Sequence, residues 1–485
     1  MGTRASLRHR ASPNSQILRS ILRAYVLAYL TTTGPRLLSF LRILRRKDLN
    51  AEEKALHLLH TLRSGLRWNR FPTFCALLMG GSTILPALIV RLQKRILVSR
   101  STASRGAIRF LAVLLSAWLC FPILNRKYLQ STSQAAATQK SQEIGQIKSS
   151  SSDGRSHPET QVIPDLAGRT LDLSLFALVR AADVLACIAW DKWKGYRKSK
   201  HSWTPLESIA PNLGDSGMFA ASAAVVMWAW FYLPERLPCS YGKWIGEVAQ
   251  VDSRLIEALR SARRGEWKYG QPSPKQPPLT LMCEDYGWPQ EWGDPSKTVP
   301  IPCEMVHMGC GPSCEKHALW RFAKAFKFAC TGYLPLALAL RWRSRSLSAF
   351  LDAAKNSIRS SAFLGLFVSI FYYSVCLSRT RLGPKIFSKN KVTPMMWDSG
   401  LCVAAGCMMC GWSIFVENMK RRREIALFVA PRAAATLLPR RYNRKYLWRE
   451  QAAFAVSTAI VLTCIQERPD MVRGVLGKVL SQVVH

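Results

Sequence analysis

The stretch Cys303–Leu377 decides the fold, and it reads CEMVHMGCGPSCEKHALWRFAKAFKFACTGYLPLALALRWRSRSLSAFLDAAKNSIRSSAFLGLFVSIFYYSVCL. It begins with a segment dense in cysteine and histidine and continues into an apolar run. A basic, amphipathic stretch follows from Arg341 to Arg359, and a second apolar run, Ser361–Leu377, carries almost no charge. Apolar runs that alternate with basic connectors are typical of helices that cross a membrane.

Over these residues the chain resembles a fungal member of the transmembrane protein 135 family, which has a cysteine-rich membrane module of this pattern at its N-terminus. The helical plan of that family can be followed over most of the chain. The resemblance implies an integral protein of peroxisomal or mitochondrial membranes. It also implies a role in lipid handling, fatty-acid metabolism and organelle dynamics. Composition and spacing by themselves indicate only the membrane architecture.

The rest of the chain repeats this alternation. Its 485 residues have a mean hydropathy of +0.01, which averages apolar runs with arginine-rich connectors. The longer runs approach the length needed to cross about 30 Å of hydrocarbon. The 16 Trp and 13 Tyr suit membrane–water boundaries. We expect an all-α, polytopic integral membrane protein with apolar segments at about residues 16–33, 71–90, 107–124, 171–190, 215–233, 322–340, 361–377, 398–416, 424–438 and 450–465.

The formal charge of +38 predicts an anionic partner. The basic residues form no single stripe; they mark the ends of apolar segments, which favours anionic lipid head groups over nucleic acid. Membrane lipids are therefore the expected partners, together with a second copy of the chain or other organelle-membrane proteins. Residues 1–47 contain no acidic residue and many arginines. This composition is typical of mitochondrial targeting segments and also of the basic flank of a membrane protein.

The fourteen cysteines do not indicate a secreted protein. Several, among them Cys75, Cys120 and Cys402, lie within apolar runs, where a buried thiol behaves as a small hydrophobe. The sequence contains no Asn-x-Ser/Thr sequon and no short cleavable apolar signal at its start.

Similar sequences in the two halves predict an internal duplication. SLFALVRAAD around Arg180 resembles ALFVAPRAAA around Arg432, and FAASA at Phe219 matches FAVST at Phe454. Three further correspondences occur in the same order: Phe71 with Phe363, Pro234 with Pro469, and Gly242 with Gly477. We expect two related repeats of four to five apolar helices, inverted if each crosses the membrane five times and parallel if four.

This duplication predicts three regions. Residues 1–260 form the first membrane repeat and include a Ser/Gln/Lys-rich loop at about 126–169 that should be disordered. Residues 261–302, rich in Pro, Gly and Trp, form a linker that packs on the surface of the bundle. Residues 303–485 contain the cysteine and histidine segment and the second membrane repeat.

Five residues near the start of the third region are candidate metal ligands. Zinc prefers thiolate and imidazole, and five such groups lie within 15 residues. The alternative is a structural role, in which reduced or disulfide-bonded cysteines cap the following helix. The first half of the chain has no equivalent cluster, so the site would belong to one repeat. The five candidates are Cys303, His307, Cys310, Cys314 and His317.

Arg180 and Arg432 are candidate sites for a lipid or another anion. Each lies inside an apolar segment, where an arginine that faces lipid costs about 2.5 kcal/mol or more. Each should therefore face the bundle interior, an aqueous cavity or a lipid phosphate. The alternative is a short interfacial helix whose arginine reaches the head groups. Asp183 lies three residues after Arg180 and is a candidate partner for it.

Catalytic signatures are missing from the sequence. It contains no phosphate-binding loop, no His-Glu-x-x-His and no Gly-x-Ser-x-Gly. We therefore expect a protein that is not an enzyme and that handles lipids, as the resemblance implies. The alternatives are a solute or lipid transporter with a pathway between the repeats, and a zinc-bearing membrane scaffold.

Overall fold

The computed structural model describes residues 13–44, 50–96, 104–125, 166–273, 278–341, 346–388 and 391–484. Helices dominate these ranges, and the strands found there are the two-residue pair β1 (Leu166–Ala167) and β2 (Tyr442–Asn443), which pair antiparallel. The predicted all-α class is confirmed for this part of the chain. Residues 1–12 of the basic N-terminus and residues 126–165 of the predicted disordered loop lie outside the described residues.

The chain forms two compact units. Unit 1 consists of Met1–His201 together with Arg441–His485, and unit 2 consists of Ser202–Arg440. A unit is a spatial cluster, whereas the predicted regions 1–260, 261–302 and 303–485 follow sequence similarity. The two divisions therefore place their boundaries at different residues, and the predicted regions stay a prediction.

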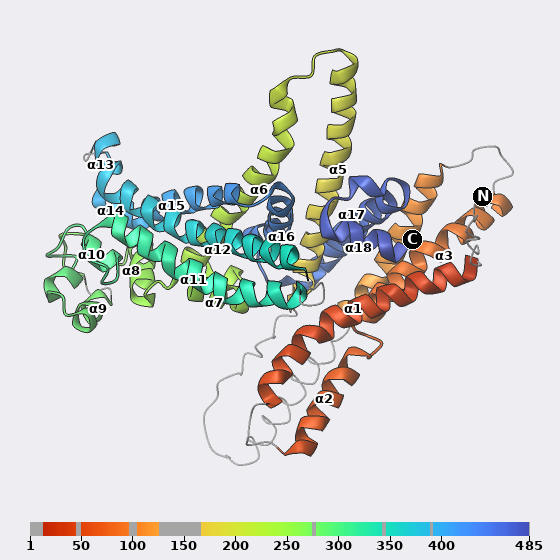
Figure 1. Cartoon of the computed structure of the whole chain (residues 1–485), viewed down its shortest axis with the longest axis horizontal. Helices are drawn as coiled ribbons and strands as arrows, with labels where there is room; N and C mark the ends of the chain where they lie inside the picture. The colour runs from red at the N-terminus through yellow and green to blue at the C-terminus, as the bar shows by residue number, and fades with distance from the viewer. Residues whose placement is uncertain are drawn as a thin grey trace, which may run out of the picture. The chain divides into compact units, whose positions relative to one another are not determined.

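Unit 1 is a helical assembly with a small apolar core. α1 packs on both α2 and α3, and α5 packs on α17 (Figure 1). The core includes Phe74, Val113, Phe121, Phe454 and Ala459, which are all buried. The helices of unit 1 are α1 (Pro13–Leu44), α2 (Ala51–Gly65), α3 (Phe71–Ile96), the helix Arg105–Asn125, α5 (Leu171–Ser199), α17 (Leu447–Glu467) and α18 (Gly474–Val484).

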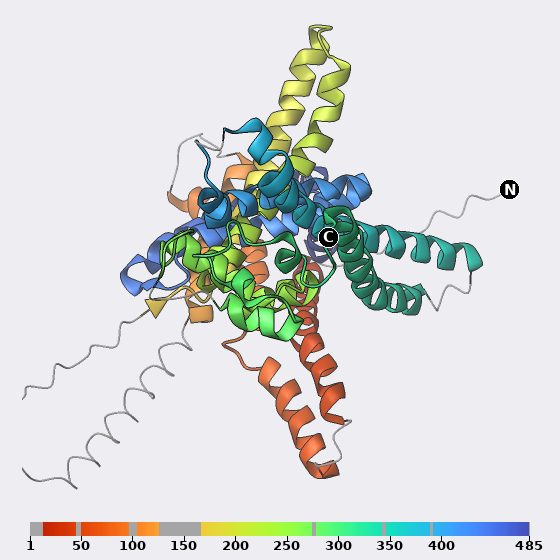
Figure 2. The same ribbon diagram turned by 90° about the vertical axis from the view of Figure 1, so that its left-hand side faces the viewer.

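Unit 2 is built around two long helices that run side by side, α11 and α12 (Figures 1 and 2). α6 packs against α15 and α16, and its apolar face shares a core with α12. The helices of unit 2 are α6 (Pro205–Tyr232), α7 (Cys239–Ala249), α8 (Ser253–Arg264), α9 (Leu279–Tyr286), α10 (Cys303–Val306), α11 (Cys314–Arg341), α12 (Leu347–Cys376), α13 (Gly383–Ile386), α14 (Pro394–Met396), α15 (Cys402–Cys410) and α16 (Met419–Leu437).

Most of the second apolar run quoted above, and the part of the basic stretch from Leu347 onward, form one continuous helix, α12. No proline interrupts Leu347–Cys376, and its single glycine, Gly365, serves close packing. A Cβ at Gly365 would lie 2.9 Å from the ring of Phe322 on α11. Small residues of this kind let helix backbones approach closely, as they do in membrane helices.

The predicted linker has a folded core of its own. Trp267, Leu279, Met282, Ile301 and Met305 are all almost fully buried and pack together. α8, which leads into this region, is capped at both ends. Its N-cap Asp252 accepts a hydrogen bond from the Arg254 N–H, and Gly265 ends the helix in the left-handed conformation (φ 73°). The region is thus held by short helices and a buried tryptophan.

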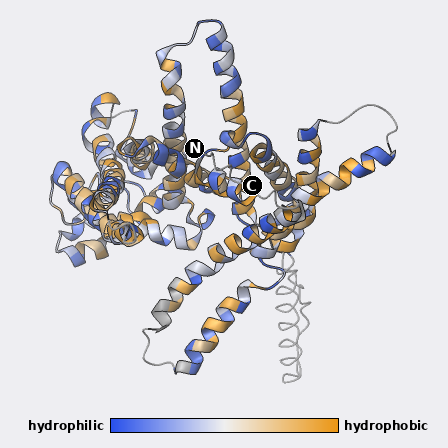
Figure 3. Ribbon diagram, turned by 45° about the vertical axis from the view of Figure 1, so that its right-hand side comes forward, coloured by the Kyte–Doolittle hydropathy of each residue, from blue (hydrophilic) through white to orange (hydrophobic). Residues whose placement is uncertain are grey.

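Five helices of the described residues are long and apolar enough to cross a membrane. Between 28% and 50% of the residues in their apolar windows are buried, so much of each apolar surface faces outward. Figure 3 shows apolar residues on the outer sides of the helices as well as between them. The five candidates are Phe71–Arg95, Arg105–Asn125, Leu171–Ser199, Leu347–Ile386 and Pro394–Val416. The other predicted apolar segments lie in α1, α6, α11, α16 and α17, which are helical but do not meet this criterion.

Two parts of the chain share a helix–turn–helix plan. α6 is followed by a short helical turn, Pro234–Arg236, and by α7. α17 is followed by a similar turn, Pro469–Met471, and by α18. α7 and α18 have the same length, 11 residues.

Candidate metal centre

Local backbone geometry places the first two candidate ligands on one side of a short helix. Cys303 and His307 are four residues apart across α10, a spacing that puts side chains on the same face. A tight turn then reverses the chain, with positive φ at Met308, Gly309 and Gly311. Glycine adopts such angles without steric cost, which explains why glycine occurs at positions 309 and 311.

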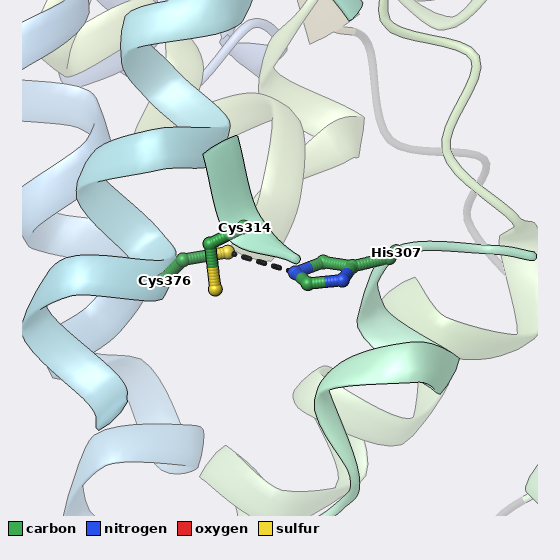
Figure 4. Close-up of side chains that lie close together, drawn as sticks. All are labelled: His307, Cys314 and Cys376. Atoms are coloured by element: carbon green, nitrogen blue, oxygen red, sulfur yellow. Dashed lines mark hydrogen bonds between the residues drawn. The ribbon is translucent and has the colours of Figure 1, made fainter. Parts of the chain in front are cut away.

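Three side chains converge beyond this turn. The ligand atoms of His307, Cys314 and Cys376 lie within 4.8 Å of one another, and all three residues are buried (Figure 4). His307 Nε2 lies 3.3 Å from Cys376 Sγ. Cys314 is the first residue of α11, and Cys376 is the last residue of α12. The three residues form a triad that could hold a metal ion.

A third thiol, that of Cys303, lies near the triad. Cys303 lies four residues before His307 on the same side of α10, but its sulfur is not among the ligand atoms that lie within 4.8 Å of one another. All fourteen cysteines of the chain are described, and all are free thiols. The alternative that the cysteines of this segment form disulfide bonds is therefore not supported by the structure.

The remaining two predicted ligands lie beside the triad. His317 is fully buried and stacks on His307, with ring centroids 4.6 Å apart. Neither ring nitrogen of His317 has a hydrogen-bond partner among the described residues. Cys310 is partly exposed and lies in the turn, where its N–H donates to the carbonyl of His307. Of the five predicted ligands, the structure thus brings together His307 and Cys314 and adds Cys376, which the sequence did not point to.

Burial and nearby arginines keep the two imidazoles neutral. Burial lowers the pKa of His317 to about 3, with smaller contributions from Arg321 and His307. Burial also lowers the pKa of His307, while the Gly311 carbonyl opposes this shift. Burial raises the pKa of the Cys303 thiol. A neutral imidazole is the form that binds metal, whereas the thiols must lose protons as a metal binds.

A buried ion pair lies one turn beyond Cys376. Arg379 Nε and Nη2 donate to the carboxylate of Asp398 at 2.5 and 2.9 Å, and the Tyr269 hydroxyl donates to the same carboxylate at 2.6 Å. Arg379 and Asp398 lie in two wide, π-helical turns, Leu377–Arg381 and Trp397–Leu401. Such turns occur mostly as single insertions in α-helices, often at functional sites.

The two candidate anion-binding arginines lie in different surroundings. Arg180 belongs to unit 1 and is 6% exposed; its guanidinium donates to the carbonyl of Arg473 at 3.4 Å. Arg473 in turn donates to Asp183, the predicted partner of Arg180, at 3.1 Å from Nε. Arg432 belongs to unit 2 and is partly exposed, with its guanidinium 3.8 Å from the centroid of the Phe428 ring.

Comparisons with models of protein families, with curated proteins and with solved structures found no match for this chain. The resemblance to the transmembrane protein 135 family therefore stays a prediction made from the sequence.

Proposed function

We propose that this chain is a multi-pass protein of an organelle membrane that handles lipids, in peroxisomes or mitochondria as the resemblance implies. The outward apolar surface of the five candidate spans supports the membrane part of this proposal. Leu119 and Met408, for example, are 69% and 67% exposed within two of these spans. Water-soluble proteins rarely expose large contiguous apolar surfaces, so hydrocarbon is the environment that such helices require.

The two arginines contribute to this proposal in different ways. The partly exposed guanidinium of Arg432 could bind a phosphate or a fatty carboxylate in bidentate fashion, and stacking on Phe428 would hold it in place. Arg180 is engaged with the carbonyl of Arg473 inside unit 1. Arg432 is therefore the better candidate for contact with a lipid head group, and Arg180 the better candidate for holding unit 1 together.

Deletion and localisation test the proposed process. Cells that lack the protein should use fatty acids less well and should have peroxisomes or mitochondria of altered shape. Re-expressed Arg432→Lys should insert but restore less function, whereas a lysine at the exposed Arg421 of the same helix should restore it fully. A fluorescent fusion found in the plasma membrane, with normal growth on fatty acids after deletion, would reject the lipid role. The transporter alternative would then be tested by solute uptake into liposomes.

We also propose that the chain is a duplication whose two copies exchange helices. In the predicted register α5 corresponds to α16, α6 to α17 and α7 to α18. α5 packs on α17 in unit 1, and α16 packs on α6 in unit 2. Each unit therefore combines helices of both copies, and the two combinations are reciprocal.

Contacts at corresponding residues support the exchange. Phe454 lies 5.8 Å from Phe74 in unit 1, and its counterpart Phe219 lies 5.7 Å from Phe363 in unit 2 (ring centroids). The register aligns Phe363 with Phe71, one helical turn before Phe74, so the two contacts lie on corresponding helices but are shifted by three residues. An acidic residue precedes each phenylalanine by four positions and bonds to the partner helix. Glu450 accepts from Ser174 of α5 at 3.1 Å. Asp215 accepts from Arg423 of α16 at 3.2 Å.

We propose zinc as the metal of the His307, Cys314 and Cys376 triad. Thiolate and imidazole ligands in a buried cluster suit zinc better than magnesium or calcium, which prefer oxygen. Elemental analysis of the purified protein should find about one zinc per chain. Protein without stoichiometric zinc would leave the cysteines with a packing role only.

A further inference from the structure

Four side chains that can bind a metal meet where α10, the start of α11 and the end of α12 come together. We infer that Cys303, His307, Cys314 and Cys376 form a closed Cys3His zinc site. This inference rests on the proposed zinc and adds the fourth ligand. Four protein ligands leave no position for water or substrate, so the site is structural.

The triad atoms have a spacing close to the one that a metal requires. In tetrahedral zinc with Zn–S bonds of about 2.3 Å, ligand atoms lie about 3.8 Å apart. The ligand atoms of His307, Cys314 and Cys376 lie within 4.8 Å of one another. Cys303 lies four residues before His307 on the same side of α10, and rotation of its side chain would add the fourth ligand.

The second nitrogen of His307 has the hydrogen bond typical of a metal ligand. Nδ1 lies 2.7 Å from the carbonyl oxygen of Gly311, which makes Nδ1 the protonated nitrogen. The lone pair of Nε2 then points toward Cys376 Sγ, 3.3 Å away. Metal-bound histidines are commonly oriented by such a bond from the other ring nitrogen to a carbonyl. Neither nitrogen of His317 has such a partner within the described ranges.

A buried arginine balances the charge of such a site. Zinc with three thiolates and one neutral histidine carries a net charge of −1. Arg321 is 4% exposed, and no carboxylate of the described residues lies within salt-bridge distance of it. Its guanidinium donates to the carbonyls of Ala249 and Gln250 and lies 4.7 Å from the centroid of the Tyr372 ring. His317 packs on that same ring and on His307, so a chain of direct contacts leads from Arg321 to the proposed ligand His307.

The consequence is a metal bond between the segment Cys303–Cys314 and a candidate span. Cys376 ends α12, so zinc would fix that segment to the end of this helix. Binding one metal ion would explain why the fully buried His307 and the free thiols lie together, which packing alone does not explain.

Metal analysis of the full chain in detergent tests the ligand set. Wild type and Cys310→Ser should each contain about one zinc, whereas Cys303→Ser and Cys376→Ser should lose it and unfold at lower temperature. Cys303→His keeps a metal-binding side chain at this position, so it serves as a control for loss of zinc through misfolding. After cobalt substitution this variant should retain metal, while the sulfur-to-cobalt absorption falls by about one third, from three thiolates to two.

Each outcome decides between the two proposals. Wild type without zinc overturns the proposed metal. Zinc in wild type that persists in Cys303→Ser, with unchanged cobalt absorption, overturns the four-ligand set and leaves the triad. Loss of zinc in Cys310→Ser also overturns this set, because the structure places that thiol outside it.

Discussion

Arg379 and Asp398 form a deeply buried ion pair, with side chains 4% and 3% exposed. Breaking such a pair leaves an uncompensated charge in a poorly polarisable environment, which typically costs about 3–5 kcal/mol. Asp398→Asn should therefore lower the free energy of unfolding by about that amount. Adding Arg379→Gln should recover part of the loss, because the double variant buries no unpaired charge and still offers Tyr269 an acceptor.

Thermal unfolding in detergent measures this prediction, and a surface pair serves as its control. Arg381 and Glu315 also form an ion pair, but both side chains are 51% exposed. Water screens such a pair, so Arg381→Gln should change stability much less. Equal losses in Asp398→Asn and Arg381→Gln would contradict the assigned burial.

Arg321 provides a second prediction for a single residue. If it balances the charge of the zinc site, Arg321→Met should weaken zinc binding by about 10- to 100-fold, the usual range for groups around a metal. Arg321→Lys, which keeps the charge, should retain most of the affinity. Competition with a chromophoric chelator measures this. If both variants weaken zinc binding equally, the charge of Arg321 is not what matters, and its effect comes from its hydrogen bonds with Ala249 and Gln250 instead.

At the scale of elements, the proposed exchange of α6 and α17 predicts matching effects for corresponding substitutions in the two helices. Phe219→Ala and Phe454→Ala remove corresponding rings from the two units, and each should cost about 3–5 kcal/mol. Leu119→Ala, at a residue 69% exposed, should have little effect. Limited proteolysis should show opening of unit 2 in the first variant and of unit 1 in the second. Opening of the same unit in both would contradict the exchange.

Helix pairing also explains which part of the metal centre the sequence could predict. Cys303, His307 and Cys314 lie close together in the chain, so their spacing alone marked them. Cys376 joins them because α11 and α12 have 28 and 30 residues and pair along their length. The first residue of one helix therefore meets the last residue of the other. The sequence marked the apolar segments 322–340 and 361–377, but the pairing of the two helices depends on packing, as at Gly365 and Phe322.

The same reasoning applies to the predicted helices. Apolar periodicity marked the segments that became helices, because it reports which residues avoid water. It does not report which helix covers which. The packing of α17 on α5 depends on contacts such as Glu450 with Ser174, between residues far apart in the sequence. The similarity of the halves predicts two repeats, whereas each unit of the structure contains helices from both predicted halves.

At the scale of the whole molecule, the two divisions of the chain predict different stable fragments. Ser202–Arg440 is one continuous segment and contains every helix of unit 2. Expressed alone, it should give a monodisperse, protease-resistant protein in detergent. Residues 303–485, the predicted second repeat, lack α6 and α5, the partners of α16 and α17, and should aggregate. The reverse result would show that the sequence repeats are the folding units.

The composition of unit 1 has a consequence for how the protein is made. Its N-terminal helices α1, α2, α3, Arg105–Asn125 and α5 leave the ribosome early, but α17 and α18, which complete the same core, are translated only after Ser202–Arg440. At about 5–20 residues per second, this delay lasts on the order of tens of seconds. During that interval the newly synthesised helices of unit 1 should present an incomplete core to chaperones and quality-control proteases. A premature stop codon near residue 440 would therefore damage the beginning of the protein, although every residue there had been correctly synthesised.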